Sequence, residues 1–163
     1  MHQPKIIIFK NLPFPPSENA AYRNVPGRGR VKAQVLKDFY KELEVWEMRN
    51  RAFLKAVREY VKHLKAIQLD MYLGVHRSRI YCKDGAVKRF DASNRIKAAH
   101  DGLAMLIEKD DSFFFAGYFE KKELPDTAIE RVTMVLREFT PRAFLDDQCG
   151  QLTGNEALFS NTI

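Results

Sequence analysis

The stretch FDASNRIKAAHDGL, residues 90–103, separates apolar from polar side chains at the spacing of an α-helix. A rotation of about 100° per residue gathers four apolar residues of this region on one face: Ile96, Ala99, Leu103 and Leu106. The opposite face carries Asn94, Lys97 and Asp101. We therefore predict a helix that begins near Asp91 or Ser93, either of which could cap it, and ends near Glu108.

Strand patterns lie on both sides of this helix, at residues 5–10, 67–75, 78–82, 113–121 and 128–139. A turn at residues 76–77 would separate the second and third of these, although residues 83–85 are an equally good turn. Between the first two strands, apolar residues recur at a helical period over residues 33–66. One straight helix of this length would measure roughly 50 Å. We therefore expect a bend near residues 47–51, or else a helix that projects into a partner.

These elements predict an α+β (mixed α/β) fold, with two main helices and a mixed sheet in one small domain. A chain of 163 residues has room for little more than one domain. We place the domain at residues 1–140 and an irregular or dimer-contacting tail at residues 141–163. No run approaches the roughly 18 apolar residues of a membrane span, and the first ten residues do not resemble a signal peptide. We therefore expect a cytoplasmic protein without a membrane partner.

The charge is divided unequally along the chain, which has a net charge of +6. Residues 1–97 hold 21 Lys and Arg against nine Asp and Glu, or +12, whereas residues 98–163 hold six against twelve, or −6. Residues 22–32 read as a loop rich in Gly and cations, and four of these cations are candidate contacts to a nucleic-acid backbone: Arg23, Arg28, Arg30 and Lys32. The alternative is a solvated loop with incidental charge.

A second group of cations precedes Asp91 directly, and we predict that it also contacts phosphates. Its members are Arg77, Arg79, Lys83, Lys88 and Arg89. The alternative is that individual members are only solvated side chains.

Carboxylates at both ends of the predicted helix are candidate Mg²⁺ ligands, because this ion prefers hard oxygen atoms. They are Asp91 at its start and the pair Asp110 and Asp111 beyond its end. Lys97 could hold a phosphate oxygen or stabilise a leaving group. A straight helix would keep the two acid sites more than about 20 Å apart, so the chain must fold back before Asp110. The alternative is that these acids only cap helix ends.

Three segments carry a family resemblance in this order along the chain. The first is PFPPSEN at residues 13–19, followed by Tyr22 and Arg23; the second is residues 90–103; the third is DDS at residues 110–112. Together they resemble the RusA family of Holliday-junction resolvases over roughly residues 5–140. The second segment is similar to that family's D-x-D-N-x-x-K-x-x-x-D-x-L pattern.

The resemblance implies a homodimeric endonuclease that makes paired nicks in four-way DNA junctions, in DNA recombination and repair, within a bacterial or phage-infected cell. It implies Mg²⁺, with Mn²⁺ as a possible substitute. Asp91, Asp110 and Asp111 would bind the metal, and Lys97 would act in catalysis with Asp91 and Asp111. Asn94 would order this cluster.

Ser93 departs from the family pattern, because it stands where a second essential aspartate is expected. A serine hydroxyl is a neutral and weaker ligand than a carboxylate. Either Asp101 or Asp110 compensates, or the site binds metal more weakly. The alternative function is a branched-DNA-binding protein with reduced or no cleavage.

Overall fold

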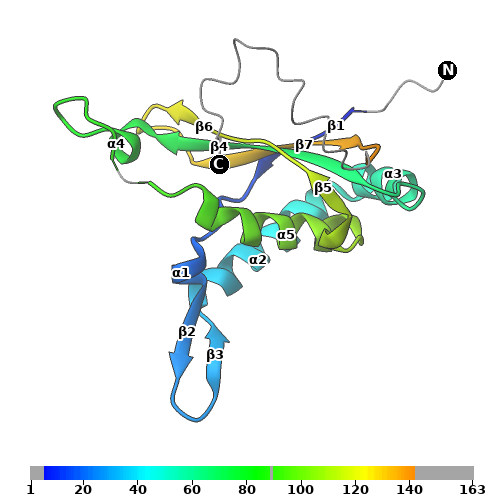
Figure 1. The fold of residues 1–163 in the computed structure, drawn as a ribbon, viewed down its shortest axis with the longest axis horizontal. Helices are drawn as coiled ribbons and strands as arrows, with labels where there is room; N and C mark the ends of the chain where they lie inside the picture. Colours follow the sequence, from blue (N-terminus) through cyan, green and yellow to red (C-terminus); the bar gives the residue numbers. More distant parts are fainter. Residues whose placement is uncertain (1–5, 89, 142–163) are drawn as a thin grey trace, which may run out of the picture.

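The computed structural model describes residues 6–88 and 90–141 and shows a two-layer α+β domain (Figure 1). A mixed sheet forms one layer, and the longer helices pack on one of its faces. This architecture confirms the predicted fold class. Arg89 and residues 142–163 of the predicted tail lie outside the described residues. Within the described ranges, the helices are too short or too polar to cross a lipid bilayer.

The main sheet is organised around its longest strand, β4. It contains β1 (Ile6–Leu12), β4 (Ile67–His76), β5 (Phe114–Ala116), β6 (Phe119–Leu124) and β7 (Arg131–Glu138). β7 lies between β1 and β4 and is antiparallel to both, whereas β5 and β6 pair with β4 in parallel. Parallel neighbours need a long crossover connection, and the chain between β4 and β5 supplies it with a helix. That helix is the segment predicted to carry the site.

The helical elements are α1 (Glu18–Ala21), α2 (Gln34–Arg49), α3 (Arg51–Val61), α4 (Arg77–Ile80) and α5 (Ile96–Ile107), with short 3₁₀ turns η1 (Ser93–Arg95) and η2 (Asp111–Phe113). The predicted bend in the long helix is confirmed, because Asn50 separates α2 from α3. The predicted apolar face of α5 is also confirmed, since Ala99, Leu103 and Leu106 are buried and Ile96 packs partly buried against the same core.

The packing of α5 on α2 is close because Gly102 has no side chain. A Cβ at Gly102 would lie 2.7 Å from Leu43 Cδ1 and 3.2 Å from two ring atoms of Phe39. These two α2 residues are buried. Tyr40, which follows Phe39 on α2, is thereby brought near Asp101 of α5. Burial is the main cause that raises the pKa of Tyr40, and the negative charge of Asp101 raises it further.

Residues 22–32 form an antiparallel hairpin, so the prediction of a loop was wrong. β2 (Tyr22–Val25) pairs with β3 (Gly29–Lys32), and the hairpin projects away from both layers (Figure 1). Gly27 and Gly29 have φ values of 72° and 69°, which lie in the left-handed region that glycine adopts without strain. The glycines that suggested irregular structure therefore form the turn.

Two predicted strands were also wrong in detail. Residues 78–82 were expected to be a strand, but α4 begins at Arg77, and its side chains pair with the β6 strand and the connection to β7. The strand predicted at residues 113–121 is divided into β5 and β6. Gly117 lies at this division, where a Cβ would be 2.4 Å from the backbone oxygen of Leu69.

Candidate active site

Lys97 joins two carboxylates that come from different places in the fold. Its ammonium nitrogen lies 2.7 Å from Asp101 Oδ1 and 2.7 Å from Asp111 Oδ2. Lys97 and Asp101 are one helical turn apart on α5, where side chains at this spacing face each other. Asp111 belongs to η2, beyond the far end of the helix. The structure therefore brings together Lys97 and Asp111, two of the three predicted catalytic residues.

The chain returns to Lys97 through a reversal at the end of α5. Glu108 has a φ of 54°, in the left-handed region, and its backbone N–H donates to Ala104 and Met105 carbonyls. A left-handed residue at this place is a usual way to end a helix. Asp110 then accepts a hydrogen bond from the backbone N–H of Ser112 at 2.9 Å, which starts η2. The chain therefore folds back at Glu108, before it reaches Asp110.

The pKa values of Lys97 and Asp111 reflect this arrangement. Hydrogen bonds to Asp101 and then to Asp111 raise the pKa of Lys97, so its ammonium is charged at neutral pH. The hydrogen bond from Lys97 is the main cause that lowers the pKa of Asp111. The side chains of Lys97 and Asp111 are 59% and 36% exposed, so solvent and a ligand can reach the cluster.

Asp91 and Ser93 form a local unit just before the helix. The Ser93 hydroxyl donates to Asp91 Oδ1 at 2.5 Å, and the backbone N–H of Asn94 donates to the same oxygen at 3.3 Å. Asp91 thus organises the turn that leads into η1, and α5 itself begins at Ile96, later than predicted. Asp110 has its own local partner, Ser112, whose hydrogen bonds lower the pKa of the Asp110 carboxyl.

Asp101 and Asp111 are both paired with the ammonium of Lys97, which lies at the point that the two carboxylates face. Mg²⁺ is usually bound through one or two carboxylates and keeps several waters. A magnesium ion could bind between these two acids only if Lys97 turned away from them. Within residues 6–88 and 90–141, three or more His, Cys, Asp or Glu side chains are nowhere grouped to hold a metal ion.

The hairpin places four predicted phosphate contacts on one projection. Arg23, Arg28, Arg30 and Lys32 are all exposed. A guanidinium nitrogen of Arg30 lies 3.3 Å from Glu18 Oε1. The guanidinium carbon of Arg30 lies over the Tyr22 ring, 4.2 Å from its centroid. Lys32 lies over Tyr40 at 5.0 Å.

The base of the hairpin adjoins the cluster formed by Lys97, Asp101 and Asp111. Tyr22, Tyr40, Lys97 and Asp101 line one small pocket. The base of the cationic hairpin therefore lies beside Lys97.

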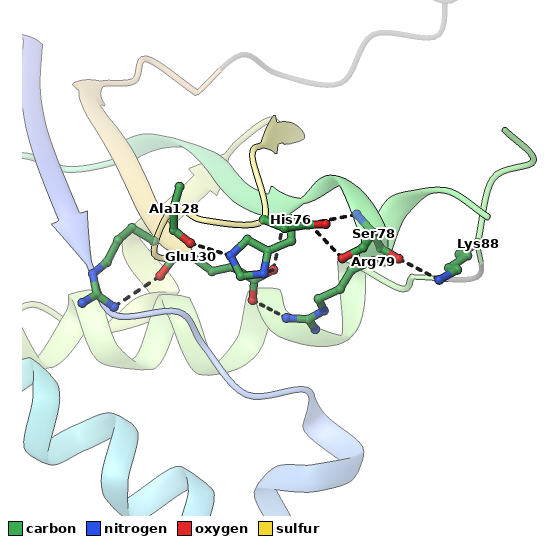
Figure 2. A network of polar contacts seen from close by, with 8 residues as sticks. His76, Ser78, Arg79, Lys88, Ala128 and Glu130 are labelled. Atoms are coloured by element: carbon green, nitrogen blue, oxygen red, sulfur yellow. Dashed lines mark hydrogen bonds and ion pairs between the residues drawn. The ribbon is translucent and has the colours of Figure 1, made fainter. Parts of the chain in front are cut away.

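Arg77 and Arg79 of the second predicted cation group belong to α4, and Lys88 is hydrogen-bonded to it; Figure 2 shows Arg79 and Lys88. Arg77 pairs with Glu123 at 2.7 Å, and Arg79 pairs with Glu130. Lys88 donates to the Ser78 carbonyl at 2.7 Å. These contacts tie α4 to the strand ends, while Arg77 remains 64% exposed and Arg79 39% exposed.

Sequence reasoning missed a neighbouring cluster centred on Arg95. Its guanidinium lies over the rings of Phe14 and Phe90 and donates to the Pro15 carbonyl at 2.5 Å. The members of this cluster come from segments far apart in the chain, so local spacing gives no signal for it. Asp101 was predicted only as a supporting acid, and its position four residues after Lys97 was the signal for its direct contact.

Comparison of the chain with protein-family models and with curated proteins found no match.

Proposed function

We propose that this protein is a metal-dependent endonuclease that cleaves phosphodiester bonds at four-way DNA junctions. The observation that carries the proposal is the 2.7 Å contact between Lys97 and Asp111, which joins two of the three segments that resemble the RusA family. The cluster is exposed, so a phosphate group could reach Lys97 and the two carboxylates.

Each residue has a defined task in this proposal. Asp111 would hold Mg²⁺ once Lys97 turns to the phosphate, with Asp91 and Asp110 as the further ligands that the resemblance implies, and Asp101 would keep Lys97 in place. The bound ion supplies an activated water and neutralises charge on the phosphate. Lys97 binds a phosphate oxygen and stabilises the negative charge that develops as the strand breaks.

The cationic surfaces support nucleic acid as the substrate. The hairpin cations and the α4 cations would bind backbone phosphates, which gives affinity without reading sequence. A homodimer would present two such sites related by two-fold symmetry, so that both nicks could be made in one junction.

The proposal is tested by incubating the protein with a labelled four-way junction and with a duplex of the same arm sequence in Mg²⁺. We expect paired nicks in opposing strands of the junction and little cleavage of the duplex. Equal cleavage of both substrates, or cleavage of neither, would overturn it.

A second candidate function is branched-DNA binding without cleavage, and Ser93 favours it. Its hydroxyl donates to Asp91, where the family pattern has a carboxylate. Ser93→Asp separates the two functions, with Ala52→Asp, at an exposed residue of α3, as the control for added charge. Cleavage that appears only in Ser93→Asp would support the binding protein, whereas cleavage by the unaltered chain supports the nuclease.

A further inference from the structure

Arg79 and Arg95 stack on the same two aromatic rings. The guanidinium carbon of Arg79 lies 5.6 Å from the centroid of Phe14 and 5.0 Å from that of Phe90. The corresponding distances for Arg95 are 5.0 Å and 4.9 Å. Two like charges are thus held close together on a half-buried aromatic surface, an arrangement that repulsion disfavours unless an anion is present.

The one carboxylate among the described partners balances only part of this charge. Glu130 binds Arg79 and is only 13% exposed. A third cation, Lys121, lies 5.8 Å from the Phe90 centroid. Arg95 Nε is buried and, among the described residues, has no hydrogen-bond partner. Burial and the charge of Arg79 lower the pKa of Arg95, and the charge of Glu130 opposes them in part.

The cluster is also held rigidly. Glu130 accepts a hydrogen bond from the backbone N–H of His76 at 2.9 Å, and the His76 ring contacts the Ala128 carbonyl (Figure 2). These bonds fix the carboxylate that orients Arg79. Arg95 is fixed by the Pro15 carbonyl. A guanidinium that is already oriented loses less entropy when it binds an anion.

We propose that Arg79 and Arg95 together bind one phosphate group of a nucleic-acid backbone. Guanidinium groups match phosphate oxygens in geometry as well as in charge. Phe90 immediately precedes Asp91, so a phosphate bound here lies at the start of the segment that carries the site. The positive end of the α5 dipole is at the same place, since α5 begins directly after Arg95. This inference rests on the proposed function and adds a phosphate site to it.

The test measures DNA affinity of Arg79→Gln, Arg95→Gln and the double variant by fluorescence anisotropy over a range of salt concentrations. Arg51→Gln, an exposed arginine of α3, controls for the loss of one charge. We expect each single variant to weaken binding on the order of tenfold. We also expect the salt slope to fall by about one. The double variant should lose less than the product of the single effects, because both arginines hold one phosphate.

A purely structural role for Arg95 is separated by two further measurements. Arg79 has no part in the Pro15 hydrogen bond, so Arg79→Gln tests the site without disturbing that contact. Urea unfolding of each variant identifies any loss of folded protein. Affinities that match the Arg51→Gln control in both single variants would overturn the inference.

Inorganic phosphate distinguishes a backbone phosphate from a free one. If phosphate raises the melting temperature of the unaltered chain but DNA affinity is the same in all variants, the pair binds free phosphate and the inference is wrong. If the arginine variants lose DNA affinity while no junction is ever nicked, the phosphate site stands and the proposed nuclease fails. If junctions are nicked and the arginine variants bind like the control, only the phosphate site fails.

Discussion

Lys97 and Asp111 are fourteen residues apart in the sequence, yet their charged atoms lie 2.7 Å apart. Lys97 lies in the first turn of α5, and Asp111 follows its last turn. The left-handed residue Glu108 reverses the chain, and η2 carries Asp111 back toward the helix start. Lys97 at the start of the helix and Asp111 beyond its end therefore belong to one cluster, in which Asp101 is the third member.

The hairpin cations should contribute non-specific phosphate contacts. Arg28→Gln removes an exposed charge near the hairpin turn. We expect affinity to fall equally for junction and duplex DNA, because phosphate contacts do not read sequence. The slope of log affinity against log salt should fall by about one. Anisotropy titrations at several salt concentrations measure both quantities, and a slope equal to that of Arg51→Gln would exclude this contact.

The attachment of α4 should depend on pH through Asp126. The backbone N–H and the hydroxyl of Ser78 both donate to Asp126 Oδ1, at 3.1 and 2.8 Å, and they lower the pKa of this carboxyl. A lowered pKa stabilises the folded state above the ordinary value of 3.8, and this stabilisation is lost as the pH falls through the folded-state value.

Asp126→Asn should therefore lower the urea midpoint at pH 7 more than at pH 3.5. The matched control is Glu44→Gln, which removes an exposed carboxylate of α2. A midpoint difference from the unaltered chain that is the same at both pH values would contradict the assignment.

Gly117 should not tolerate a side chain. A Cβ there would lie 2.4 Å from the backbone oxygen of Leu69, and the next residue is tied to β4 by a 2.7 Å hydrogen bond from the Met71 N–H to the Tyr118 carbonyl. A side chain at this position could be accommodated only if the backbone of β4 moved away. We expect Gly117→Ala to destabilise the fold by about 1–3 kcal/mol. Urea unfolding measures this, and a free energy of unfolding equal to that of the unaltered chain would refute the close approach.

The sequence predicted those elements whose local pattern agrees with their place in the fold. The apolar run at Ile6–Phe9 forms part of β1, and the charged patch around Asn50 is where the long helix breaks. The apolar face of α5 is buried because its helical spacing matches the core on which it packs.

The predictions that were wrong depended on contacts between distant residues. α4 was expected to be a strand, but Ser78 and Arg79 are held by Asp126 and Glu130, which are about 50 positions away in the chain. The hairpin was expected to be a loop because its glycines and cations carry no strand pattern, although strand pairing and two positive-φ glycines are compatible with such residues.

The candidate site was predicted in part for the same reason. The motif order indicated Lys97 and Asp111, and the structure brings them into contact. Asp101, predicted as a supporting acid, pairs directly with Lys97. The cluster of Phe14, Phe90 and the two arginines depends on three chain segments meeting, and spacing in a single sequence does not show this.

The measurement that tests the nuclease proposal most directly compares junction cleavage and junction affinity for the unaltered chain, Lys97→Ala and Asp111→Asn in the same Mg²⁺ buffer. We predict that cleavage falls on the order of 10²–10³-fold in each variant, because each removes a group that acts on the reacting phosphate. Affinity should change only a few-fold, because the arginines supply most of the phosphate contacts. Variants that cleave as fast as the unaltered chain would contradict the role assigned to the Lys97–Asp111 pair.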